Sequence, residues 1–167
     1  MSGRATIDAF RFARERQSLR GKIALFDLPR LNESLVGTPG SVEYTLEGGT
    51  DEQGRPVLTL SLSAALPVVC QRCLDPVTVA VAPTTRFVLV ASEAELPPVE
   101  NEPEEWTAIV GSTSMHVEAL VEDELILALP IAPAHAEGEC RAAQDGDGMA
   151  GVENPFSALS SLKRKKI

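Results

Sequence analysis

The feature that most constrains this fold is a pair of cysteines set between two segments rich in β-branched residues. The flanks are residues 66–69 and 76–81, and between them lies Cys70-Gln71-Arg72-Cys73. Such flanks are typical of half-buried strands, so the sequence predicts a hairpin with Cys-Gln-Arg-Cys at its turn. A turn of this kind can direct both sulfurs into one concavity, where thiolates bind a soft metal or interconvert with a disulfide.

Periodicity in the rest of the chain predicts more strands than helices. Alternating apolar and polar residues indicate strands at 42–46 and 57–64, with Leu58, Leu60 and Leu62 facing inward and a hairpin loop at 48–54. Further strands are expected at 21–27, 84–90 and 106–110.

Three segments carry helical patterns. A helix capped by Thr6 is expected over residues 6–17, and a short helix over 28–36. The clearest helix spans 117–129, where an apolar stripe broken by Glu124 precedes Pro130. The predicted fold class is therefore α+β, with a mainly antiparallel, barrel-like sheet, an N-terminal helix, a helix near 117–129 and a flexible C-terminal tail.

The length of 167 residues suits one well-packed domain. We expect this domain at residues 1–135 and a flexible tail at 136–167, because periodicity is lost after Pro133. No apolar run approaches about 18 residues, so no membrane span is expected. The arginine-rich start lacks the apolar segment of a secretory signal, and three cysteines make no disulfide framework, so the expected location is cytoplasmic.

The net charge of −9 is unevenly distributed. Residues 1–30 hold seven Lys/Arg against three acids, and four cations stand at 163–166, whereas the intervening residues hold 4 basic and 21 acidic groups. An acidic body binds nucleic acid poorly by itself, because phosphate neutralisation needs clustered cations. It is better suited to a basic partner protein, although acidity can equally serve solubility.

The residues give no sign of an active site. The chain has only two histidines, His116 and His135, and no glycine-rich phosphate loop. Its carboxylates fall on a loop and on one helix face, where solvated acids normally lie. The sequence therefore predicts a protein that is not an enzyme and has no small-molecule substrate.

Three interpretations of Cys70 and Cys73 remain open. A thiol-redox pair would normally open a helix, but a strand is expected after Cys73. A structural zinc site would take His135 and Cys140 as its other ligands, and it would fasten the chain after the long helix to the hairpin. The third interpretation is a pair of reduced cysteines kept for shape or for a partner. The residues favour it slightly over zinc, because Cys140 stands in a flexible-looking stretch and no glycine follows Cys73.

Candidate partner-binding residues lie at the hairpin turn and at the C-terminus. Arg72 is placed to contact a partner, although a lone arginine on a turn is usually only solvated. The C-terminal segment combines apolar residues at helical spacing with a cationic run, which favours ordering on a partner and contact with phosphate. Its candidate residues are Phe156, Leu159, Leu162, Lys163, Arg164, Lys165 and Lys166.

Three motifs together resemble the bacterial YceD family, named for large ribosomal RNA subunit accumulation. They are Cys70-Gln71-Arg72-Cys73-Leu74, residues 120–135 (LVEDELILALPIAPAH) and residues 154–163 (NPFSALSSLK). The resemblance implies a cytoplasmic, non-enzymatic factor that supports 23S rRNA levels and large-subunit biogenesis. The charge distribution then suggests that the acidic body engages a ribosomal protein or pre-50S particle while the basic ends touch rRNA. The rival hypothesis is a small cytosolic thiol-redox protein that uses Cys70 and Cys73.

Overall fold

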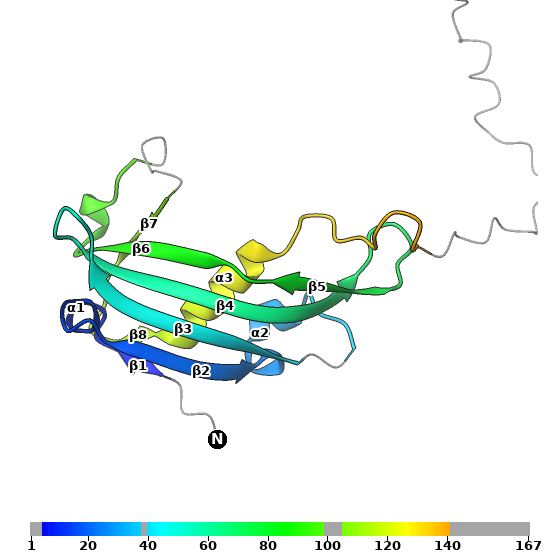
Figure 1. The fold of residues 1–167 in the computed structure, drawn as a ribbon, viewed down its shortest axis with the longest axis horizontal. Coiled ribbons are helices and arrows are strands. Elements are labelled where there is room, and N and C mark those ends of the chain that lie inside the picture. Colours follow the sequence, from blue (N-terminus) through cyan, green and yellow to red (C-terminus); the bar gives the residue numbers. More distant parts are fainter. Residues whose placement is uncertain (1–4, 38–39, 99–104, 141–167) are drawn as a thin grey trace, which may run out of the picture.

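The computed structural model of the chain describes residues 5–37, 40–98 and 105–140. Within these ranges most of the regular structure is extended (Figure 1). The strands are β1 (Thr6–Ile7), β2 (Ser18–Ala24), β3 (Ser41–Thr50), β4 (Pro56–Val69), β5 (Pro76–Val81), β6 (Thr84–Val90), β7 (Thr107–Val110) and β8 (Met115–His116). The α-helices are α1 (Ala9–Arg14), α2 (Pro29–Asn32) and α3 (Val117–Ala128). The chain is therefore α+β, as the sequence predicts.

The main sheet has the strand order β2-β3-β4-β6-β7, and β5 pairs with the far end of β4. Its ladders are antiparallel except the parallel pair β6·β7. Among the described strands, β2 and β7 form the two edges, so the sheet is open and the barrel-like closure expected from the sequence is not formed. The short strands β1 and β8 pair with each other away from this sheet.

Strand β4 is the longest element, with 14 residues. At about 3.3 Å per residue it extends some 45 Å, which is longer than the sheet it crosses. Its first half pairs with β6 and its second half with β5, while the chain bends at Ala82 and Pro83 between these partners. The β4–β5 hairpin consequently projects past the main sheet as an arm, which we call the cysteine arm (residues 64–81; Figure 1).

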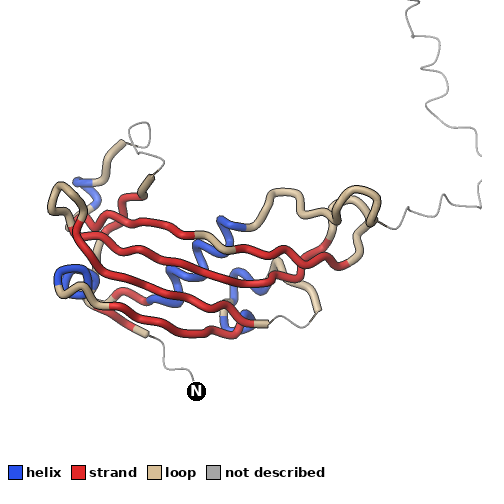
Figure 2. Tube along the Cα trace, in the orientation of Figure 1, coloured by secondary structure: helices blue, strands red, loops and turns tan. Residues whose placement is uncertain are grey.

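The core lies between one face of the sheet and the helices (Figures 1 and 2). Leu58, Leu60 and Leu62 alternate along β4 and are buried, as their period of two predicts. Helix α3 supplies Val117, Val121 and Leu125 from its apolar stripe. These side chains belong to one continuous hydrophobic cluster.

Helix α1 packs closely over β3 because Gly48 has no side chain. A Cβ at Gly48 would lie 2.3 Å from the carbonyl oxygen of Phe12. The Gly48 N–H also donates to the Gln17 carbonyl at 2.8 Å. The end of β3 is thus shaped to receive the helix backbone.

Several local predictions need correction. The first helix begins at Ala9, where the Asp8 side chain accepts the Arg11 N–H at 3.0 Å, so Thr6 is not its cap. Thr6 instead lies in β1, opposite His116. The next strand runs over Ser18–Ala24 and is not centred on 21–27, and the helix expected over 28–36 is the single turn α2.

The long helix, by contrast, matches its expected range closely. Within the described ranges no helix has both the length and the apolar character that crossing a membrane requires. The division into a domain at 1–135 and a tail at 136–167 stays a prediction, because residues 141–167 lie outside the described ranges.

Candidate metal centre

The cysteine arm ends in a tight turn that places Cys70 and Cys73. The last ladder pair is Val69 with Pro76. Beyond it the Cys70 N–H donates to the Asp75 carbonyl at 2.9 Å, and the Leu74 N–H donates to the Cys70 carbonyl at 3.0 Å. These bonds close the turn on itself, so both thiols are held by backbone geometry.

Leu74 has a left-handed backbone conformation, with φ of +63°. Glycine normally takes this conformation, since a Cβ makes it unfavourable by about 1–2 kcal/mol. The absence of glycine after Cys73 therefore does not prevent the tight turn, contrary to the inference from the sequence. The Leu74 side chain is 73% exposed, so burial gives little compensation for the strain.

The segment after α3 returns to this turn. The Gln71 N–H donates to the Pro133 carbonyl at 2.8 Å. The Arg72 guanidinium donates to the carbonyls of His135 and of Ala136, the latter at 3.3 Å. Arg72 therefore binds the chain's own backbone, and its predicted contact with a partner stays a prediction.

Cys70, Cys73, His135 and Cys140 meet at this point. Their candidate ligand atoms all lie within 4.8 Å of one another. The Cys70 and Cys140 sulfurs are 3.7 Å apart, and His135 Nδ1 lies 3.4 Å from Cys73 Sγ and 3.8 Å from Cys140 Sγ. The structure thus brings together the four residues that the sequence nominates as zinc ligands.

The surroundings of the four side chains fix their orientation. His135 Nε2 lies 3.1 Å from the Pro76 carbonyl oxygen, which as an acceptor makes Nε2 the protonated nitrogen and leaves the Nδ1 lone pair toward the sulfurs. The Arg72 N–H lies 3.4 Å from Cys70 Sγ. Cys70 is fully buried, whereas the other three side chains are half-buried.

The thiols of Cys70 and Cys140 differ widely in pKa. Burial raises the pKa of Cys70, but hydrogen bonds from the backbone N–H groups of Cys73, Arg72 and His135 outweigh it and lower the pKa to about 5. Burial, with hydrogen bonds to Cys70 and Cys73, raises the pKa of Cys140 to about 11. The cluster alone therefore favours one thiolate beside a protonated thiol.

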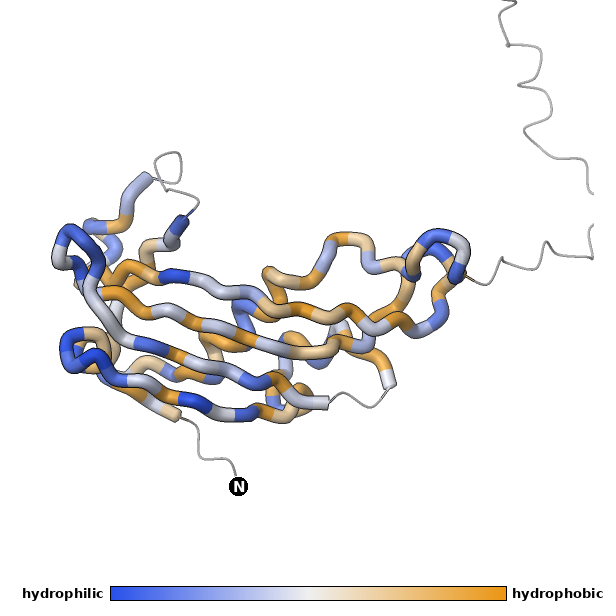
Figure 3. The backbone as a smooth tube through the Cα atoms, viewed as in Figure 1, coloured by the Kyte–Doolittle hydropathy of each residue, from blue (hydrophilic) through white to orange (hydrophobic). Residues whose placement is uncertain are grey.

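Leu66 anchors the base of the arm in the main hydrophobic cluster, but the outer part of the arm has little hydrophobic support. Val68 and Cys70 are buried but stand outside the main hydrophobic cluster. Residues 130–140 form no helix or strand, and Ile131 is completely exposed. Figure 3 shows the apolar strands of the arm ending in a hydrophilic tip. Polar bonds and the Cys/His cluster are thus the main described links at this end.

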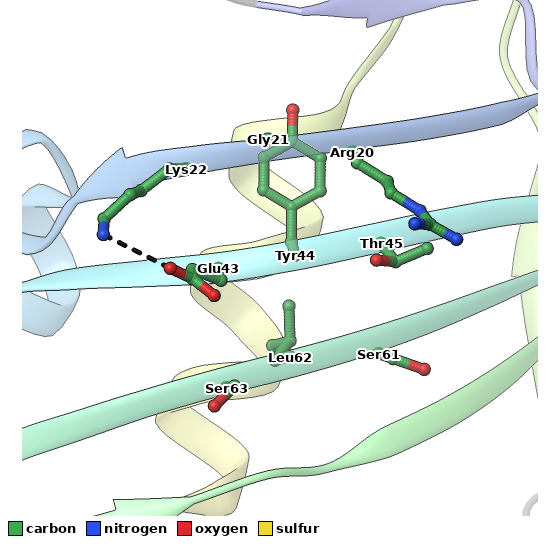
Figure 4. A pocket seen from close by; sticks show the side chains of 9 residues that line it. All are labelled: Arg20, Gly21, Lys22, Glu43, Tyr44, Thr45, Ser61, Leu62 and Ser63. Atoms are coloured by element: carbon green, nitrogen blue, oxygen red, sulfur yellow. Dashed lines mark hydrogen bonds and ion pairs between the residues drawn. The ribbon is translucent and has the colours of Figure 1, made fainter.

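A second feature of the described structure is a polar concavity on the main sheet (Figure 4). It is lined by Arg20, Gly21, Lys22, Glu43, Tyr44, Thr45, Ser61, Leu62 and Ser63. Lys22 Nζ pairs with Glu43 Oε1 at 3.3 Å, and the Tyr44 ring fills the space beside Gly21. Neither histidine nor cysteine lines it, and its polar side chains come from the adjacent strands β2, β3 and β4.

Sequence reasoning missed one buried carboxylate. Glu122 of α3 accepts the backbone N–H groups of Arg30 at 2.7 Å and Leu31 at 3.2 Å, and it pairs with the Arg30 guanidinium at 2.9 Å. These contacts join α3 to α2, so the acids of this helix are not all solvated. The exposed Leu74 was also missed, because only tertiary structure reveals its exposure.

Comparison with known proteins gives the family. A family model described as "Large ribosomal RNA subunit accumulation protein YceD" matches residues 58–163. The Haemophilus influenzae protein with the same description is 31% identical over 169 residues, covering 96% of this chain and 95% of that protein. The chain belongs to the YceD family. The match includes Cys70, Cys73, His135 and Cys140, and it extends through the tail to Lys163.

No solved structure matches the chain. The predicted tail contacts Phe156, Leu159, Leu162, Lys163, Arg164, Lys165 and Lys166 lie outside the described residues. Of the predicted partner-binding residues, the structure therefore places Arg72.

Proposed function

We propose that this YceD-family chain supports large-subunit rRNA accumulation by binding a ribosomal protein or a precursor particle, without transforming a substrate. The observation that carries the proposal is the family match, which spans nearly the whole chain and includes both the cysteine arm and the tail. The family is named for accumulation of an RNA and not for a reaction. Such a role requires a surface that binds a partner stably.

The charge distribution supports a division between protein and RNA contacts. Four basic and 21 acidic residues lie between residue 31 and residue 162, which favours a basic protein such as those of the ribosome. The arm tip and the segment beside it continue this pattern with Asp75, Glu137 and Glu139. Lys163–Lys166 supply the cations that phosphate binding needs. In this proposal the body meets protein and the basic end meets rRNA.

The alternative is a thiol-redox protein that uses Cys70 and Cys73. Reactive cysteines of that kind are accessible and stand at a helix N-terminus. Cys70 is fully buried, and β5 follows the turn instead of a helix. The double variant Cys70→Ser/Cys73→Ser separates the two functions, because a redox protein would lose all activity and a binding factor would lose mainly stability.

The direct test is co-sedimentation of the full chain with immature large-subunit particles, followed by crosslinking from the arm and the tail. We expect a ribosomal protein to crosslink to the arm and to remain bound after nuclease treatment. Reversing the charge of Lys163–Lys166 should remove the rRNA crosslink and leave the protein contact, whereas reversing Lys22 on the sheet serves as the control. Loss of every ribosomal protein after RNA removal would argue against direct protein binding.

A genetic measurement tests the wider role. Cells without the gene should show a lower ratio of 23S to 16S rRNA, and the wild-type gene should restore it. A normal ratio and a normal large-subunit peak in the deletion strain would contradict the proposed function.

A further inference from the structure

We propose that Cys70, Cys73, His135 and Cys140 bind one Zn²⁺ ion in a structural Cys3His site that fastens the segment after α3 to the cysteine arm. This inference is independent of which partner the chain binds. It rests on the identity of the four ligands, their separations, the groups around them and the weak packing of the arm.

The ligand set is selective. Three sulfurs and one imidazole nitrogen form a soft donor group that favours Zn²⁺ over Mg²⁺ or Ca²⁺, which take oxygen ligands. Four protein ligands complete a tetrahedral shell and leave no position for water or substrate. The site is therefore structural and not catalytic.

Three of the six ligand separations are close to the edges of a zinc tetrahedron, and all six lie within 4.8 Å. Bonds of about 2.3 Å to sulfur and about 2.0–2.1 Å to nitrogen imply a sulfur–sulfur edge of about 3.8 Å and a sulfur–nitrogen edge of about 3.5 Å. The Cys70–Cys140 sulfur separation is 3.7 Å, and His135 Nδ1 lies 3.4 Å and 3.8 Å from its two sulfur neighbours. A disulfide would need sulfurs about 2.05 Å apart, and the three cysteines are free.

The surrounding groups suit a bound metal. The Pro76 carbonyl accepts from His135 Nε2 and so presents Nδ1 as the ligand, an arrangement common at zinc-bound histidines. All three cysteines bind Zn²⁺ as thiolates, so the protons still held by the thiols pass to solvent, and the Zn²⁺ with three thiolates carries one negative charge. The Arg72 backbone N–H lies 3.4 Å from Cys70 Sγ, where it can stabilise the thiolate.

The segment after α3 has few other described attachments to the cysteine arm. The segment 130–140 is largely exposed and irregular, and its described direct bonds to the turn come from Gln71, Arg72 and His135. A zinc ion would join two pairs of ligands more than 60 residues apart in the chain. It would thus hold in place a surface that hydrophobic packing alone does not secure.

Metal analysis of the full chain, purified under reducing conditions without chelator, is the first test. We expect one zinc per chain, and Co²⁺ replacement should give the visible absorption of a tetrahedral cobalt–thiolate site. The variants His135→Ala and Cys140→Ser should lose the metal, whereas His135→Cys should retain it as a four-cysteine site. His116→Ala changes the only other histidine and should retain one zinc.

Hydrogen exchange distinguishes a structural site from an adventitious one. Chelation should increase exchange in residues 70–76 and 130–140 while the β3·β4 ladder stays protected. Three outcomes overturn the proposal: protein without stoichiometric zinc, iron or a Cys70–Cys140 disulfide in its place, or equal zinc in His135→Ala and wild type. If Cys140→Ser does not fold, the comparison of His135→Ala with His135→Cys still decides the outcome.

Discussion

Glu122 and Asp123 are adjacent acids on α3 that share one guanidinium, and they should contribute very unequally to stability. Arg30 Nη2 lies 2.9 Å from Glu122 and Arg30 Nη1 lies 2.7 Å from Asp123. The Glu122 side chain is 7% exposed, whereas that of Asp123 is 51% exposed. The two distances alone would predict similar effects on stability, so the difference in burial determines which acid contributes more.

The magnitude follows from what each truncation leaves behind. Glu122→Ala leaves the backbone N–H groups of Arg30 and Leu31 without an acceptor, at about 1–3 kcal/mol each when water cannot reach them. Because Arg30 is partly solvated, we expect a total loss of about 3 kcal/mol in the free energy of unfolding. Asp123→Ala removes an exposed ion pair and should lower it by about 0.5 kcal/mol.

Urea unfolding followed by the fluorescence of Trp106 measures both effects, since Trp106 is the only tryptophan. For a chain of this size a loss of about 3 kcal/mol lowers Tm by roughly 6–12 °C. Glu122→Gln keeps an acceptor oxygen and should fall between the two truncations. Equal losses for Glu122→Ala and Asp123→Ala would refute the reasoning that the backbone bonds matter more than the ion pair.

Three further predictions concern the backbone and one carboxylate. Leu74→Gly should raise the free energy of unfolding by roughly 1 kcal/mol in urea titration, because it relieves the left-handed strain; a loss would contradict this. Gly48→Ala should destabilise by about 2 kcal/mol or more through its clash with α1, whereas Gly49→Ala, whose Cβ would have 3.6 Å of clearance, should change little by the same assay. Burial raises the pKa of Asp51, but hydrogen bonds from Arg55 outweigh this and hold the pKa below its usual range. Its stabilisation is therefore present above the unfolded pKa of about 3.9 and lost as pH falls through the lower folded value, so Asp51→Asn should flatten the acid side of the stability profile.

Local patterns predicted the elements whose determinants are local. The apolar stripe and Pro130 delimit α3 within one residue, and the alternation of Leu58, Leu60 and Leu62 identifies the buried face of β4. Thr6 was misassigned because its extended conformation depends on β8, more than 100 residues later. The burial of Glu122 was missed for the same reason, because its partners lie on α2, far away in the sequence.

The candidate site was predictable in composition but not in geometry. The sequence offers three cysteines and two histidines, so it nominates this set of four, although it slightly favoured a pair of reduced cysteines without a metal. Their approach depends on the extension of β4 past the sheet and on the return of the chain after Pro130. Leu74 illustrates the limit, since its residue type argues against a conformation that the surrounding bonds impose.

The contact between Cys70 and Cys140 has a consequence for the order of events during synthesis. A growing chain exposes the arm long before residue 140 exists, so the tip must wait for α3 to be translated and packed. Closing so long a loop is entropically costly for a free chain but far less so once the sheet and helix have already brought its ends together. The contacts between Cys70 and Cys140 can therefore form only after α3 has been made, and prior folding of the sheet and α3 would make them easier to form.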